Sequence, residues 1–234
     1  MQIKKFRREH KLFLVEGAKS VLELLNSSYQ IDSLFITPAF YDLYSKTIPE
    51  RISFEIISQK DLERLGEYVS NDSALAVVKM GENVELKPEG NEYILVLDGI
   101  NDPGNLGTLL RIADWYGISK IICSETTADV HNSKVISASM GSFTRVRLHY
   151  CNLVDYLKNI KAPIYGAVLE GRGIHSMKFD SSGFIVLGSE ASGISNEVQS
   201  LVTEKITIPR YGKAESLNVA VAAAVICDNL RRVV

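Results

Sequence analysis

Polar side chains gather in three segments of the second half of the chain, and each segment directly follows an apolar run. The segments are 101–111, 187–193 and 208–218. They contain one arginine, one glutamate, one serine and two asparagines that are candidates for a site: Arg111, Glu190, Ser216, Asn105 and Asn218. Each segment carries glycine and leads into a helical pattern, which is typical of a loop between a strand and a helix.

These residue types indicate a site that binds and orients a ligand, because a guanidinium stabilises negative charge while amides and carboxylates position their partners. In a parallel sheet, the loops at the carboxyl ends of the strands emerge at one edge and can converge. Neither GxGxxG nor GxxxxGK[ST] occurs in the chain. The segments are therefore not the phosphate-binding loops of the common nucleotide-binding folds.

Each of these residues also has a purely structural explanation. Asn105 ends an ordinary turn signature and could cap a helix. Arg111 could form a surface ion pair, Glu190 could lie in the first turn of a short helix, and Ser216 could be a helix N-cap. Each residue taken singly could have only this structural role. The occurrence of all five residues at one expected sheet edge favours a common site.

The elements that must position this site follow from the apolar pattern. Strands are predicted at 93–97, 119–123, 145–149, 163–168, 184–188 and 205–208, and helices at 106–116, 132–139, 152–159, 195–201 and 216–232. Regular alternation of strands and helices predicts an α/β fold with a mostly parallel sheet that is covered on both faces.

A smaller α/β unit precedes this one. Its predicted strands are 12–15, 31–36, 52–57 and 74–78, and its predicted helices are 18–25, 40–44 and 58–65. Between the units, glycine, proline and charged residues are dense and apolar periodicity is lost, which is typical of a linker. The sequence thus predicts a domain at 1–80, a linker at 81–92 and a second domain at 93–234.

Composition limits the classes of function. The 234 residues carry a formal net charge of −2, so any nucleic-acid surface must be local. The first eleven residues hold five cations, which form either such a surface or a frayed terminus: Lys4, Lys5, Arg7, Arg8 and Lys11. The three cysteines lack metal-ligand spacing, and no apolar run is long enough to cross a bilayer. We therefore expect a cytoplasmic protein without a bound metal or a membrane partner.

The three segments resemble, in order, the motifs of the SpoU/TrmH family of RNA ribose 2′-O-methyltransferases, in the knotted SPOUT superfamily. The matching stretches are Asp102-Pro103-Gly104-Asn105-Leu106-Gly107 with Arg111 and Gly117, then Gly188-Ser189-Glu190-Ala191-Ser192-Gly193, then Ile208-Pro209 with Ser216-Leu217-Asn218-Val219. Residues 13–17 and 74–79 resemble the RNA-binding α/β domain that many members carry. Two positions depart from the family pattern: Arg210 stands where methionine is frequent, and Ala220 where serine is frequent.

The resemblance implies a trefoil-knotted, mostly parallel sheet with helices on both faces, preceded by a smaller α/β RNA-binding domain. It implies S-adenosylmethionine as the cofactor, held near Gly188, Ile208 and Leu217, and methyl transfer to a ribose 2′-hydroxyl. Arg111 occupies the family's catalytic position, where we expect it to stabilise the developing alkoxide. The other candidates orient Arg111 and the ribose, with Glu190 as the expected partner of Arg111: Asn105, Glu190, Ser216 and Asn218.

Large-subunit ribosomal RNA is the favoured substrate, because of the extra N-terminal domain, and tRNA is the alternative. Two other functions stay open at this point: a non-catalytic RNA-binding or ribosome-assembly protein, and a methyltransferase acting on a base nitrogen. The last predicted helix, 216–234, is nearly apolar all round through its middle. A terminal helix of this kind must be covered on more than one side, either by its own domain alone or also by a second subunit. The resemblance to a family whose members are dimers favours a homodimer formed by the second domain.

Overall fold

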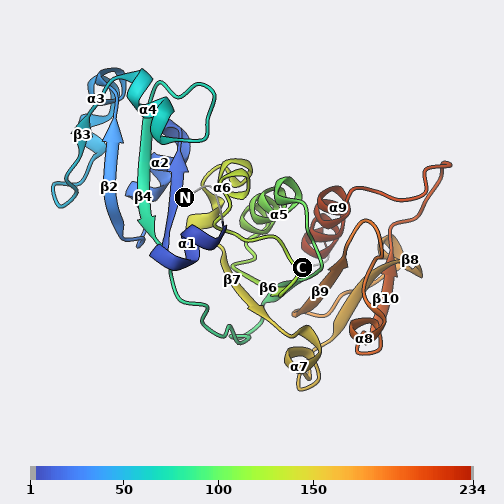
Figure 1. The fold of residues 1–234 in the computed structure, drawn as a ribbon. Helices are drawn as coiled ribbons and strands as arrows, with labels where there is room; N and C mark the ends of the chain where they lie inside the picture. Colours follow the sequence, from blue (N-terminus) through green and yellow to red (C-terminus); the bar gives the residue numbers. More distant parts are fainter. Residues whose placement is uncertain (1–3, 233–234) are drawn as a thin grey trace. The chain divides into compact units, whose positions relative to one another are not determined.

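The computed structural model of the protein describes residues 4–232, and these residues form two compact units (Figure 1). The first unit comprises 4–82 together with Asp129–Arg145, and the second comprises Asn83–Ala128 together with 146–232. The segment 129–145, which the sequence analysis placed in the second domain, thus packs with the first unit. Among the described residues, no helix is long and apolar enough to span a membrane.

The first unit is built on a four-stranded sheet of order β1-β4-β2-β3. Its strands are β1 (Leu12–Glu16), β2 (Ile31–Ile36), β3 (Glu55–Ile56) and β4 (Ala74–Lys79), and its main helices are α2 (Ala18–Leu25), α3 (Pro38–Tyr44, followed by η1, Ser45–Thr47) and α4 (Gln59–Leu65). The β2–β3 pair is parallel and the other two pairs are antiparallel. The predicted strand 52–57 is reduced to two residues, because only Phe35 and Ile36 of β2 pair with it.

Local capping explains where two of these helices begin. Thr37 accepts a hydrogen bond from the Phe40 backbone N–H at 3.2 Å, and Pro38 occupies the first turn. Ser58 accepts from the Asp61 backbone N–H at 3.2 Å. A side-chain oxygen at the N-cap satisfies an N–H that has no partner within the helix, so both helices begin where their caps stand.

The described residues begin with a helix, α1 (Lys4–His10), that the sequence analysis did not predict. Arg7 is buried and its Nη2 binds Asp129 Oδ2 at 2.8 Å, within the first unit. Although burial alone would raise the pKa of Asp129, hydrogen bonds from His131 and Arg7 hold it well below the usual range of a carboxyl group. A lowered pKa keeps this pair charged at neutral and mildly acidic pH. The five terminal cations are therefore not a free basic tail, since Arg7 has a structural partner.

The segment 129–145 contains α6 (Ser133–Ser139) and η2 (Ser142–Thr144), and it packs on β1 of the first unit. The ring of Phe13 lies 4.7 Å from that of His131 and 6.3 Å from that of Phe143. Ser133 donates a hydrogen bond to Glu67, and Arg145 binds Glu23 at 2.6 Å. These contacts explain why the segment belongs to the first unit although it lies far along the chain.

The second unit is a six-stranded parallel sheet of order β10-β8-β9-β5-β6-β7. Its strands are β5 (Tyr93–Asp98), β6 (Lys120–Ser124), β7 (Arg147–Cys151), β8 (Ile164–Gly173), β9 (Gly183–Gly188) and β10 (Glu204–Thr207). Its helices are α5 (Pro103–Trp115), α7 (Leu153–Leu157), η3 (Ile174–Ser176), α8 (Asn196–Gln199) and α9 (Val219–Arg232). The predicted α/β class and the parallel sheet are confirmed.

Helices cover both faces of this sheet, with α5 and α9 on one face and α7 and α8 on the other (Figure 1). On the α7 and α8 face, Ile94, Val96 and Val186 pack with Leu153 and Val198 in one core. The alternate residues of the same strands are buried on the opposite face. Burial on both faces explains why these strands read as continuous apolar runs.

The predicted linker has no helix or strand, but it is docked on the second unit. Leu86 enters the core, and the Asn83 side chain hydrogen-bonds both the N–H and the C=O of Tyr150 at the edge of the sheet. The buried Lys120 Nζ donates to Lys87 O at 2.8 Å and to Glu92 Oε1 at 2.7 Å. A buried ammonium needs such partners, so segment 83–92 is a structural part of the second unit.

Candidate active site

Three loops of the second unit leave the carboxyl edge of the parallel sheet and meet there. They follow β5, β9 and β10, as the sequence analysis expected. Strands β5 and β9 are neighbours, with Asp98 opposite Gly188, which brings the first two loops side by side. The third loop, 208–218, runs from the edge strand β10 to helix α9, which packs against α5 and β9.

Asn105, Glu190 and Asn218, one from each loop, form a closed set of hydrogen bonds that we call the amide–carboxylate triad. Asn105 Nδ2 donates to Glu190 Oε1 at 2.9 Å. Asn218 Nδ2 donates to Asn105 Oδ1 and to Glu190 Oε1, both at 2.9 Å. Hydrogen bonds to an ionised acceptor are stronger than neutral ones, so the triad fixes the three loops relative to one another.

Helix capping positions the two asparagines of the triad. Asp102 Oδ1 accepts from the Asn105 backbone N–H at 2.7 Å and so starts α5. Asn218 Oδ1 accepts from the backbone N–H of Ala220 at 2.9 Å, which makes Asn218 the N-cap of α9. The last helix therefore begins at Val219 and not at 216, and Ser216 is not its cap. Residues 233 and 234 of the predicted helix lie outside the described residues.

The Glu190 loop is a tight turn. The backbones of Ser189 and Gly193 exchange two hydrogen bonds of 3.0 and 2.9 Å, and Ser189 Oγ accepts from the Ser192 N–H at 3.1 Å. A Cβ atom on Gly188 would lie 2.0 Å from the carbonyl carbon of Gly193, closer than any real contact. Glycine at 188 thus permits the close backbone approach that presents Glu190 at the tip of the turn.

A cavity of about 760 Å³ opens beside this turn. The three residues predicted to hold a cofactor all line it, together with two of the predicted catalytic residues: Gly188, Ile208, Leu217, Glu190 and Ser216. Much of its wall is apolar, from Val168, Leu187, Ile206 and Ile226 among others. A pocket with an apolar wall and a few polar groups at its rim is typical of small-molecule sites.

Arg111 lies apart from these contacts. It is exposed on α5, it does not line the cavity, and it forms no ion pair with Glu190 in the part of the chain that the structure describes. The expected Glu190–Arg111 pair is therefore replaced by the amide–carboxylate triad. The Glu190 carboxylate accepts hydrogen bonds from two amides, because Asn105 and Asn218 both reach its Oε1 atom.

Two features of the site were missed by the sequence analysis. Asp98 Oδ2 accepts from Ser195 N–H and Oγ at 2.8 and 2.7 Å, and so joins the end of β5 to the start of α8. Residues 167–170 of β8 form a wall of the cavity. The acidic residue at the end of β5 was a sequence signal for the contact between Asp98 and Ser195. The apolar residues of β8 carried no pattern that distinguishes a pocket wall from a core.

Comparison with known proteins identifies the family. Residues 92–228 match the SpoU rRNA Methylase family, and residues 1–76 match the MRM3-like substrate binding domain. The Bacillus subtilis 23S rRNA (guanosine(2553)-2′-O)-methyltransferase RlmP is 29% identical over 235 residues, covering 99% of this chain and 93% of the relative.

Solved structures agree with this match. A Porphyromonas gingivalis structure assigned to the TrmH family superposes with a TM-score of 0.87 at 36% identity, covering 99% of this chain and 94% of the other. An AdoMet-bound rRNA methyltransferase from Sinorhizobium meliloti has the same fold, with a TM-score of 0.87 at 24% identity and coverage of 99% and 91%. The resemblance of the three motifs is thus confirmed, and the chain belongs to the SpoU rRNA methylase family.

Proposed function

We propose that the protein transfers a methyl group from S-adenosylmethionine to a ribose 2′-hydroxyl of ribosomal RNA, with large-subunit RNA as the favoured substrate. The observation that carries this proposal is the amide–carboxylate triad, which brings the three family motifs of this chain together beside one cavity. The B. subtilis relative, which this chain matches over almost its whole length, is named as a 23S rRNA 2′-O-methyltransferase and supports the choice of substrate.

The cavity fits the proposed cofactor. Its apolar walls suit the adenine ring and the methionine chain, and the loop backbones at Gly188, Ile208 and Leu217 offer polar groups. When bound, S-adenosylmethionine supplies a methyl group already activated by its sulfonium. The protein then has to hold the ribose in line and stabilise the charge that develops on its oxygen.

Arg111 is assigned the second task. Its guanidinium is not readily deprotonated, so we infer that it stabilises the alkoxide and binds the adjacent phosphate rather than acting as a base. Asn105, Glu190 and Asn218 hold the loops in register, and Ser216, which lines the cavity, is assigned to orient the ribose. The return of the chain from the edge strand β10 to α9 in the middle of the sheet supports the trefoil knot of the family. An RNA substrate and free Cys123, Cys151 and Cys227 support a cytoplasmic location.

The direct test is a map of 2′-O-methyl groups in total RNA from cells with and without the gene. We expect one ribose methyl group in large-subunit ribosomal RNA to disappear with the gene. Loss of a methyl group from tRNA instead would redirect the substrate assignment. Loss of a base methyl group would contradict ribose chemistry, and an unchanged map would favour a non-catalytic role.

Asn218→Ala tests the triad. The change removes the N-cap of α9 and two hydrogen bonds of the triad, so we expect the free energy of unfolding to fall by about 1–2 kcal/mol and methyl transfer to fall about 100-fold. Thermal unfolding and single-turnover methyl transfer measure the two effects.

Asn152→Ala is the matched control for that variant, because Asn152 caps α7 in the same unit through the Asp155 N–H at 3.1 Å. It loses a cap of the same kind but leaves the triad intact, so its methyl transfer should match that of the unchanged protein. Equal activity of both variants would show that the triad has no role beyond capping.

The N-terminal unit is proposed as the RNA-binding domain, which covers residues 1–80 in the predicted boundaries. A fragment of residues 83–234 keeps segment 129–145 without the first-unit surface on which it packs, so its binding of S-adenosylmethionine is measured first as a test of folding. The fragment should still bind the cofactor but lose most RNA affinity. The affinity of the whole protein should fall steeply with salt because phosphate contacts release counterions. A filter-binding titration with unmethylated ribosomal RNA measures both. An affinity unchanged by the deletion would overturn the assignment.

A second fragment, 91–234, separates the docked segment from the RNA-binding unit. It loses Leu86 and the Lys87 carbonyl, so the buried Lys120 would keep only part of its partners. We expect its unfolding midpoint to lie several degrees below that of fragment 83–234. Equal midpoints would mean that segment 83–90 is only a tether.

We propose that the second domain forms a homodimer through α5 and α9. These helices pack together, and both expose large apolar side chains: Trp115 is 84% exposed on α5, and Val221 is 51% exposed on α9. Ala223, Ile226 and Cys227 of α9 are buried within the unit, and Val221 is the large apolar side chain of this helix that stays exposed. A second subunit packed along the two helices would cover both Val221 and Trp115.

Val221→Glu should therefore turn the dimer into a monomer of 25.9 kDa in sedimentation at micromolar concentration. A carboxylate at the centre of an apolar interface must be desolvated, which opposes association. Leu65→Glu is the control, because Leu65 is 50% exposed on the first unit and lies outside the proposed interface. A monomeric and active unchanged protein would refute the dimer.

A further inference from the structure

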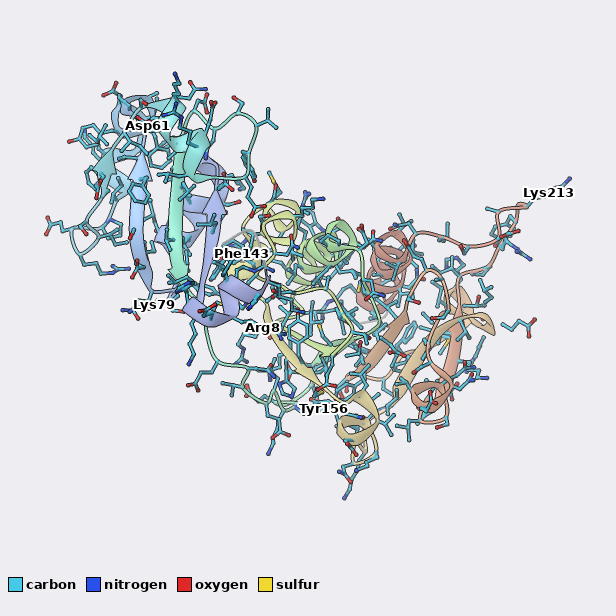
Figure 2. The ribbon with its side chains drawn as sticks, in the orientation of Figure 1. Arg8, Asp61, Lys79, Phe143, Tyr156 and Lys213 are labelled. Carbon is cyan, nitrogen blue, oxygen red and sulfur yellow. The ribbon has the colours of Figure 1, made fainter. Side chains whose placement is uncertain are left out.

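The loop that runs from β10 to the triad carries an aromatic side chain that is almost fully exposed. Tyr211 is 93% exposed, and it lies between the cations Arg210 and Lys213. Figure 2 shows Lys213 at the outer end of this loop, pointing away from the second unit. A single exposed aromatic side chain is ordinary and does not by itself indicate a function. The position of the loop and its hydrogen bonds must therefore be considered.

A hydrogen bond within this loop joins residues on either side of its tip. Arg210 Nη1 donates to the Ala214 carbonyl at 3.2 Å, which closes a bend with Tyr211 and Lys213 at its tip. A Cβ atom on Gly212 would meet nothing within 4 Å, so the loop has open space at the residue that follows Tyr211. The guanidinium that stands where the family often has methionine thus links the two ends of the bend that carries Tyr211.

The same loop reaches the cavity of the candidate site. Tyr211 lines the cavity together with Ser216 and Leu217, and the loop ends at Asn218 of the triad. RNA whose ribose enters this site must place its neighbouring nucleotides over the rim. The first groups that these nucleotides meet outside the cavity include an exposed ring and an exposed ammonium.

From this placement, and resting on the proposed function, we propose that Tyr211 stacks on a base next to the methylated nucleotide and that Lys213 binds a flanking phosphate. Aromatic rings bind unpaired bases by stacking whatever the base, and lysine binds phosphate as a point charge. Arg210 acts as a positioning residue in this proposal, because its hydrogen bond to Ala214 spans the bend that carries the ring. The loop therefore orients single-stranded RNA for the reaction.

A second copy of the chain is a less fitting occupant. The centres of protein interfaces are depleted in lysine, and this loop presents an exposed lysine at its tip. The apolar side chains proposed for the dimer lie on α5 and α9. Coverage of the loop by a partner subunit is nevertheless an outcome that the experiment detects.

The test uses the full chain and unmethylated 23S ribosomal RNA transcribed in vitro. Tyr211→Ala should raise the KM for this RNA about tenfold or more with little change in kcat, since one stacked base is lost. Tyr211→Phe should behave like the unchanged protein, because stacking needs the ring and not the hydroxyl. Arg210→Met should raise KM in the unchanged background but not when Tyr211 is already alanine.

Lys213→Ala should lower the slope of log affinity against log salt by about 0.7–0.9, the value of one phosphate contact. Lys178→Ala is its matched control, because Lys178 is an exposed lysine of the same unit outside the loop. An equal change of slope in both variants would contradict a specific phosphate contact at Lys213.

Three other results would overturn the stacking role: an unchanged KM for RNA in Tyr211→Ala, a defect that moves to the KM for S-adenosylmethionine, or a changed sedimentation coefficient. The last would assign the loop to a subunit interface. Methyl transfer by the unchanged protein is measured first. Complete absence of methyl transfer by the unchanged protein would refute the proposed function itself. Normal transfer by the unchanged protein, together with an unchanged KM for RNA in Tyr211→Ala, would refute only the role of this loop.

Discussion

Arg111→Ala is expected to abolish methyl transfer while S-adenosylmethionine still binds. Arg111 does not line the cavity, so its removal leaves the proposed cofactor contacts at Gly188, Ile208 and Leu217 in place. Loss of one group that stabilises transition-state charge typically lowers kcat about 100- to 1000-fold. Calorimetric titration of the cofactor and single-turnover transfer to ribosomal RNA separate the two quantities.

Arg147→Ala serves as the control, since Arg147 is an exposed arginine on β7 at the opposite edge of the sheet from the cavity wall β8. It removes the same charge from the same unit, so a general loss of electrostatic attraction for RNA would appear in both variants. Arg111→Lys should recover little activity, because an ammonium cannot make the paired contacts of a guanidinium. Near-normal turnover of Arg111→Ala would remove this residue from the mechanism.

Gly188→Ala should have the largest effect on cofactor binding. The added methyl group would lie 2.0 Å from Gly193 C and 2.1 Å from Ile194 N, both backbone atoms that cannot move aside as a side chain can. The turn must open, which displaces Glu190 from the triad and the backbone that faces the cavity. We expect cofactor affinity to fall about 100-fold and the free energy of unfolding by about 1–3 kcal/mol.

The matched control is Gly81→Ala, because a Cβ atom at Gly81 would meet nothing within 4 Å and its φ is not positive. This variant should bind S-adenosylmethionine and unfold like the unchanged protein. A Gly188→Ala protein with normal cofactor affinity would show that the turn tolerates opening, and the role of Gly188 in the cavity would then be wrong.

Local pattern by itself determined most of the regular structure. Continuous apolar runs gave the strands of the second unit because both faces of a parallel sheet are buried. Side-chain capping gave the start of α4 at Ser58, since that interaction lies within four residues of sequence. The three polar segments were placed at one edge because parallel strands deliver their carboxyl ends together. The cofactor residues Gly188, Ile208 and Leu217, which line the cavity, followed instead from the resemblance to the family motifs.

Tertiary contacts decided the roles of several charged residues and the unit to which one segment belongs, neither of which the local sequence pattern encodes. Arg7 is buried through Asp129, and Lys120 through Lys87 and Glu92, so charged residues that look solvated in the sequence are structural. The segment 129–145 belongs to the first unit because Phe143 packs on Phe13. Each of these contacts joins residues tens of positions apart, and no local periodicity encodes such a pair.

The candidate site shows the same division. Residue types and spacing identified Asn105, Glu190 and Asn218 as members of one site, but Glu190 was expected to pair with Arg111. In the structure, two amides donate hydrogen bonds to the Glu190 carboxylate. The caps of α5 and α9 bring Asn105 and Asn218 to the same oxygen of this carboxylate. The choice between competing partners of one carboxylate depends on distances across three loops, and only the folded chain sets those distances.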